Sequence, residues 1–269
     1  MSIEKKVQEI HELVERLTRY INEEIVVKNN KSGQELAEPL QFFLNLLFKT
    51  NNALDTANFL FGSIIKKPRY NDSIGLILRT SLSDVISYMY ILHKSGGNEK
   101  QLIHWINICD YDHIQYFWSK EKVYKKVSKV STEEWDQMKD TLKENFPQFF
   151  DENGLPNDSI YKRWKTPGPI ALEIFESGKE KQYQYLREAF EYYDLYSKVE
   201  HLGKATEFLI HESFHDEFKI NSLIRIHRSF IILSFHLSVW ATYFSGKGTE
   251  EINYIIERVN DLCKIKLEN

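Results

Sequence analysis

A histidine and glutamate pattern typical of zinc enzymes lies in the second half of the chain. His211, Glu212 and His215 form the sequence H-E-x-x-H. On a helix this spacing places both imidazoles one turn apart on the same face, where they can bind zinc, and the glutamate can act as general base on a metal-bound water. The motif therefore predicts a zinc-dependent hydrolase as one alternative for the function.

The residues around this motif do not complete the usual zinc site. Two acidic residues follow it directly, whereas such helices normally continue with uncharged residues, and Phe235 stands where a downstream glutamate ligand would be expected. His227 or His236 would have to supply a third imidazole. A short motif of common residues also occurs by chance, so the other alternative is an exposed helix end or loop that binds no metal.

An arginine lies within a strongly apolar stretch in the first third of the chain. Arg79 belongs to the segment 76–86, LILRTSLSDVI, whose apolar residues recur at helical spacing. An arginine near the edge of such an apolar stripe is at least partly buried and needs an anion or carbonyl groups around it. The predicted partner is an acidic side chain of the same domain, such as Asp84 or Glu200, and the alternative is a carboxylate or phosphate of a bound ligand.

A third group combines a tyrosine, a serine and a histidine at intervals of four residues. Tyr193, Ser197 and His201 share one face of a predicted helix, and Gly203 offers a place for that helix to end. These side chains could hydrogen-bond a ligand or exchange protons, because histidine titrates near neutral pH. The alternative is a helix end at which the histidine faces the negative end of the helix dipole and the serine bonds a backbone carbonyl. Together with Arg79, the three residues define a predicted polar pocket.

Two of these stretches together resemble a bacterial protein family. Residues 79–81 (Arg-Thr-Ser) and residues 193–201 (Tyr-x-x-Tyr-Ser-x-x-x-His) resemble the domain-of-unknown-function family 5677, in which a leucine takes the place of Tyr196. The resemblance implies a helical protein of similar length and assigns no activity. It also implies that the arginine, the serine and the histidine of the two stretches act together.

Helical ribonucleases of bacterial defence systems provide a further alternative. The HEPN-type enzymes carry an arginine and a histidine at a short spacing on the same helix. This chain has no such pair, because seven residues separate Arg228 from His236. A diverged nuclease of this kind would have to bring Arg79 and His201 together from different helices.

The charge of the chain argues against nucleic acid as its general partner. It contains 35 lysines and arginines against 39 aspartates and glutamates, a formal net charge of −4. One local stretch is basic, because residues 120–129 contain five lysines, interrupted by Glu121. Such a lysine-rich face is usually solvated, and binding of a phosphate backbone is the alternative. The predicted partner is therefore a small ligand or a protein.

Helical periodicity dominates the elements that must position these residues. We expect an all-α, multi-helix bundle of about eight helices in a single domain (1–269), with a long irregular loop at about 147–169, where prolines and glycines cluster. In the first helix, apolar residues from Ile3 to Ile21 alternate in steps of four and three. This seam, with the tyrosine-rich helix that carries Tyr193, predicts either packing within the chain or a homo-oligomer.

Cysteine usage and the apolar segments predict a cytoplasmic location. The two cysteines, Cys109 and Cys263, form no C-x-x-C pair, which fits a reducing compartment. The N-terminal segment is charged and lacks the apolar core of a signal peptide, and the most apolar run, residues 231–244, is too short to span a bilayer. The sequence therefore predicts a cytoplasmic binding or regulatory domain without membrane contact, and without a cofactor unless the H-E-x-x-H motif holds zinc.

Overall fold

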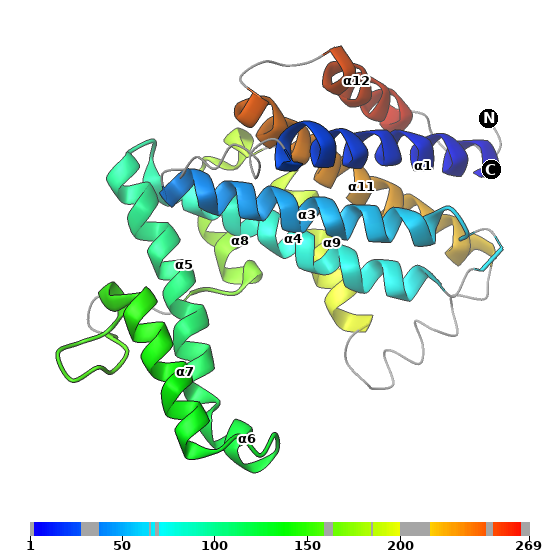
Figure 1. Cartoon of the computed structure of the whole chain (residues 1–269). Coiled ribbons are helices and arrows are strands. Elements are labelled where there is room, and N and C mark those ends of the chain that lie inside the picture. Colours follow the sequence, from blue (N-terminus) through cyan, green and yellow to red (C-terminus); the bar gives the residue numbers. More distant parts are fainter. Residues whose placement is uncertain are drawn as a thin grey trace. The chain divides into compact units, whose positions relative to one another are not determined.

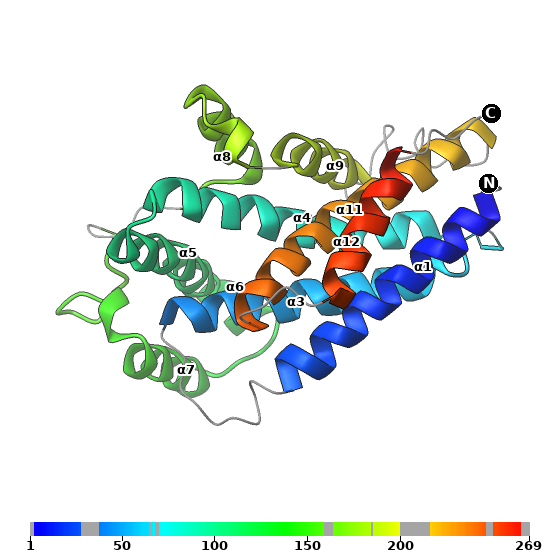
Figure 2. The same cartoon turned by 90° about the horizontal axis from the view of Figure 1, so that it is seen from above.

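Helices form the regular structure of the protein. A computed structural model describes residues 3–27, 38–64, 66–67, 70–158, 164–183, 185–199, 216–245 and 250–264. Over these residues no strand is present, and the extended backbone contributes one isolated bridge, between Phe150 and Pro156. Figures 1 and 2 show the helices from two directions. The predicted all-α, multi-helix fold is confirmed.

The elements follow one another through two compact units. In chain order they are α1 (Ile3–Tyr20), the π-helix η1 (Ile21–Val26), α3 (Glu38–Phe61), α4 (Tyr70–Ser95), α5 (Glu99–Ser119), α6 (Glu121–Lys126), α7 (Thr132–Asn145), the 3-10 helix η2 (Pro147–Phe149), α8 (Pro167–Glu176), the 3-10 helix η3 (Glu180–Gln182), α9 (Leu186–Val199), α11 (Asp216–Ser245) and α12 (Glu250–Lys264). Unit 1 comprises residues 1–90 and 167–269, and unit 2 comprises residues 91–166. The single domain that the sequence predicted over residues 1–269 stays a prediction.

Unit 1 is built around the apolar faces of α1, α3, α4 and α11. The helix α1 packs on α3 and α12, and α11 packs on α3, α9 and α12, as Figure 1 shows. The seam of α1 faces this core, because Ile10, Val14, Leu17 and Ile21 are all buried. On its polar side, Arg16 forms an ion pair with Glu251 of α12 at 2.8 Å. These four positions of the seam therefore pack within the chain, as in the first of the two predicted alternatives, and a homo-oligomer stays a prediction.

Several helix ends follow directly from local sequence. The Ser131 side chain and the Glu134 side chain form a reciprocal capping box at the start of α7. After α4, Gly96 and Gly97 adopt φ values of 54° and 81°, which glycine reaches without steric cost. The predicted irregular loop at 147–169 ends earlier than expected, since α8 begins at Pro167. Proline suits the first turn of a helix because the missing N–H has no partner there anyway.

Two helices are bounded by positions without an evident sequence signal. The helix α5 ends at Ser119, and α6 begins after Lys120. The helix α9 begins at Leu186, directly after Tyr185, which adopts a left-handed φ of 67°. Neither position carries the glycine or proline that normally marks such a break.

Unit 2 is a helical segment with an aromatic interior. Trp135 of α7 is fully buried, and its ring stacks on Phe117 of α5 at 4.6 Å and on Tyr124 of α6 at 5.3 Å between ring centroids. A second cluster joins Tyr111 to Phe149, with the Tyr111 hydroxyl bonded to the Asp158 carboxylate. Burial raises the pKa of Tyr111, and the neighbouring carboxylate adds to the effect. These rings fix α5, α6 and α7 together.

Glu121 of α6 lies between two lysines of unit 2. Its Oε1 accepts a hydrogen bond from Lys125 Nζ at 2.8 Å, and its Oε2 lies 2.9 Å from Lys139 Nζ. The hydrogen bond from Lys125, followed by that from Lys139, lowers the pKa of Glu121 to about 2 from the ordinary value of 4.5. Because this pKa is lowered by folding, the two ion pairs stabilise unit 2 above pH 4.5 and are lost as the pH falls through about 2.

We predict that a carbon-detected NMR titration of the Glu121 carboxyl will show a midpoint near pH 2. Replacing Lys139 by methionine should raise this midpoint, because one of the two ammonium donors is lost. The exposed Lys100→Met serves as a control that should leave it unchanged. A midpoint near the ordinary value of 4.5 in the unaltered protein would show that these ion pairs do not form.

Among the residues described, no helix is both long and apolar enough to cross a membrane.

Candidate functional site

Helices α4, α9 and α11 of unit 1 meet around Tyr196 of α9, which rests on a glycine of α4 and contacts Ser229 of α11. An added Cβ on Gly75 of α4 would lie 2.7 Å from Cδ1 of Tyr196 of α9, so only glycine lets this ring rest on the α4 backbone. The tyrosine is buried to 5% exposure. Its ring therefore anchors α9 to α4, and it brings the neighbouring residues of both helices together.

Arg79 lies one turn after Gly75 and reaches the same helix. Its guanidinium carbon is 5.6 Å from the centre of the Tyr193 ring, within the range of a cation–π interaction. Both side chains are half-buried. The sequence placed these two residues in one polar pocket, and the structure brings them together. Of the two expected acidic partners of Arg79, Asp84 forms an ion pair with Lys49 of α3 at 2.8 Å, and Glu200 lies outside the described residues.

Helix α11 contributes a second arginine to the junction. The Ser229 hydroxyl donates to the backbone carbonyl of Arg225 at 2.9 Å, so the Tyr196 hydroxyl, 3.3 Å from Ser229 Oγ, is the donor in that pair. Burial raises the pKa of Tyr196 to about 12. Burial also lowers the pKa of the Arg225 guanidinium, and the nearby Tyr196 and Tyr192 oppose this change. Arg225 is thus a partly desolvated cation beside two phenol groups.

A third arginine of the junction, also on α11, holds α9 in place. Two hydrogen bonds, at 2.7 and 2.8 Å, join Arg228 Nη2 to both carboxylate oxygens of Glu188. Burial raises the pKa of Tyr192, Glu188 raises it further, and Arg228 lowers it. Because the Glu188 carboxylate is bound to Arg228, this pair fixes the position of α9 against α11.

The serine of the predicted pocket is bonded within its own helix. Ser197 Oγ donates a hydrogen bond to the backbone carbonyl of Asp194 at 2.7 Å. This bond agrees with the alternative in which the serine bonds a backbone carbonyl near the end of a helix. His201 lies outside the described residues, two positions after the end of α9.

The H-E-x-x-H motif, with His211, Glu212 and His215, also lies outside the described residues. Its two candidate third ligands are both on α11. They are nine residues apart, so they point to opposite sides of the helix. A three-histidine site could therefore use one of them and not both.

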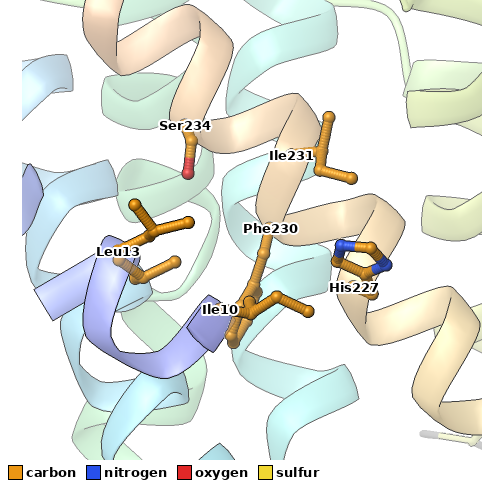
Figure 3. A pocket seen from close by; sticks show the side chains of 7 residues that line it. Ile10, Leu13, His227, Phe230, Ile231 and Ser234 are labelled. Carbon is orange, nitrogen blue, oxygen red and sulfur yellow. The ribbon is translucent and has the colours of Figure 1, made fainter. Parts of the chain in front are cut away.

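The surroundings of these two histidines differ. His227 lines a cavity of about 10 Å³, room for one water-sized sphere, between α11 and the α1 residues Ile10 and Leu13 (Figure 3). His236 is buried beside Tyr88 of α4 and Trp240, with ring centroids 6.2 and 6.1 Å away. The described part of the chain contains no group of three or more histidine, cysteine, aspartate or glutamate side chains that could hold a metal ion.

The junction contains residues that the sequence did not place at the site. Arg225, Arg228 and Glu188 join Arg79 and Tyr193 there. Arg225 and Arg228 could have been identified from the sequence in the same way as Arg79, because each of them also interrupts an apolar helical segment.

Comparison of the chain with models of known families, with curated proteins and with solved structures finds no significant match.

Proposed function

We propose that the protein is a binding or regulatory domain that recognises a small anion at the junction of α4, α9 and α11. The observation that carries this proposal is the convergence of two half-buried arginines, from two helices, on neighbouring tyrosines of a third. Arg79 lies against Tyr193, and Arg225 lies beside Tyr192 and Tyr196. The ligand group is a phosphate or a carboxylate.

The chemistry of these side chains favours such a ligand. A guanidinium presents a planar set of N–H donors that matches the oxygens of a carboxylate or phosphate. Half-burial strengthens this attraction, because fewer water molecules screen the charge than at an exposed site. The tyrosines provide an apolar wall and hydroxyl donors for the remainder of the ligand. Tyr193 and Arg225 are both partly exposed, so a ligand can reach the site from solvent.

Isothermal titration calorimetry with inorganic phosphate and with succinate tests the proposal and distinguishes the two anion chemistries. Arg79→Gln and Arg225→Gln should each weaken binding of the preferred anion by about tenfold or more, because each removes a charged donor. The matched control is Arg187→Gln. Arg187 is an exposed arginine of α9 that pairs with Glu191 at 2.9 Å, so its loss should leave the affinity unchanged.

Two outcomes would reject the anion site. The first is that neither phosphate nor succinate binds. The second is that all three substitutions weaken binding equally, which would indicate attraction by general surface charge. Circular dichroism of each variant should show that the helices are retained, so that a loss of affinity can be distinguished from a loss of fold.

A further inference from the structure

The lysine-rich stretch of the sequence forms an exposed basic surface in unit 2. Lys122 and Lys126 lie one turn apart on α6, and Lys129 lies in the turn that leads to α7. All three are exposed. Among the described residues, no carboxylate lies within ion-pair distance of any of them. The three lysines are therefore exposed within eight residues of one another in the sequence.

The acid within this stretch does not neutralise these charges. Glu121 is the one acidic residue between Ser119 and Thr132. Its two carboxylate oxygens are bound to Lys125 and Lys139. Because Glu121 is paired with Lys125 and Lys139, it does not neutralise Lys122, Lys126 or Lys129.

Lys129 occupies a backbone position that favours glycine. Its φ is 54°, in the left-handed region, where a side chain with a Cβ is strained. The turn is closed by a hydrogen bond from Val130 N to the carbonyl of Tyr124 at 3.2 Å. A glycine there would form the same turn with less strain. The turn itself therefore does not require a lysine at this position.

An exposed aromatic ring stands beside the lysines. Tyr116, near the end of α5, is 64% exposed, and Lys120 Nζ lies 4.6 Å from the centre of its ring. The next residue, Phe117, stacks on the buried Trp135, so the backbone that carries Tyr116 is held by the aromatic interior of unit 2. The surface thus combines several ammonium groups with a tyrosine ring that is largely exposed and contacts one of them, that of Lys120.

We infer that this surface, formed by Tyr116, Lys120, Lys122, Lys126 and Lys129, binds single-stranded nucleic acid. Lysines attract the phosphate backbone, and an exposed ring stacks on a base, which are the two elements of sequence-tolerant single-strand binding. An anionic bilayer is a poorer match, because two exposed valines of this segment offer little apolar surface for insertion. An acidic peptide would use the lysines and leave the tyrosine ring without a partner.

Fluorescence anisotropy of a labelled single-stranded oligonucleotide, measured over a series of salt concentrations, tests this inference. Replacing Lys122, Lys126 and Lys129 together by glutamine should weaken binding by about tenfold or more at low salt, and should reduce the salt slope by about 2. The control replaces Lys100, Lys179 and Lys181, three exposed lysines elsewhere in the chain, and should change neither quantity. Tyr116→Ala should weaken binding roughly fivefold or more, whereas Tyr116→Phe should retain it.

The single substitution Lys129→Gly separates binding from folding. It should raise the melting temperature, because glycine relieves the left-handed strain, while it lowers the affinity for the oligonucleotide. Absence of oligonucleotide binding, equal losses in the control triple variant, or binding to vesicles of phosphatidylserine and phosphatidylcholine without binding to the oligonucleotide would overturn the inference. These results are independent of the anion site, since Arg79 and Arg225 belong to unit 1.

Discussion

Replacing Trp135 by alanine is expected to destabilise unit 2 by about 3–5 kcal/mol. The indole is fully buried and stacks on Phe117 and Tyr124, so its removal leaves a cavity among three helices. In the described part of unit 2, the other aromatic side chains that are fully buried are Tyr111 and Phe149, which form a separate cluster. Amide hydrogen exchange followed by mass spectrometry should show faster exchange throughout α5, α6 and α7.

Met138→Ala is the matched control for this substitution. Met138 lies on the same helix α7 and is 40% exposed, so its truncation should change the free energy of unfolding by about 0.5 kcal/mol or less. If exchange in α5 to α7 were the same in the Trp135 variant as in the unaltered protein, the aromatic interior of unit 2 would not be what holds it together.

Gly75→Val is expected to destabilise unit 1 by about 1–3 kcal/mol or more and to impair the anion site. Even the first added carbon would lie 2.7 Å from the Tyr196 ring, which is buried and bonded to Ser229. The ring must then move, and with it the neighbouring Tyr193 that faces Arg79. Chemical denaturation gives the change in stability, and calorimetry gives the change in anion affinity.

Two further variants isolate the steric cause. Ser73→Val introduces the same side chain at an exposed position of α4, so it reports the helix propensity of valine alone. In the double variant Gly75→Val with Tyr196→Ala, the clash is absent, so the combined loss should be smaller than the sum of the single losses. Additive losses, or an unchanged stability of Gly75→Val, would contradict the close contact between α4 and α9.

Local sequence patterns were sufficient to predict most of the helices. The capping box at Ser131, the glycines after α4 and the apolar spacing of α4 and α11 depend on neighbours a few residues away, so one sequence reveals them. The breaks at Lys120 and Tyr185 could not be predicted in this way. Both are non-glycine residues, and the ring of Tyr185 packs on Phe235 of α11, with 5.3 Å between the ring centroids.

The site was predictable only in part, for a similar reason. Arg79 and Tyr193 were identified because each interrupts or extends a helical pattern in its own segment. Arg225 reaches the same place through the packing of α11 on α9, a contact between residues distant in the sequence. The basic stretch was visible in the sequence, but Glu121 could be discounted only once Lys139 was seen beside it.

The most direct test of the anion site is a titration of the protein with inorganic phosphate, followed by NMR of the arginine Nε–H groups. We expect the signals of Arg79 and Arg225 to shift saturably with one common dissociation constant, while the signal of Arg187 stays in place. Equal, non-saturating shifts of all three arginines, or a saturable shift confined to Arg187, would rule out an anion site at this junction.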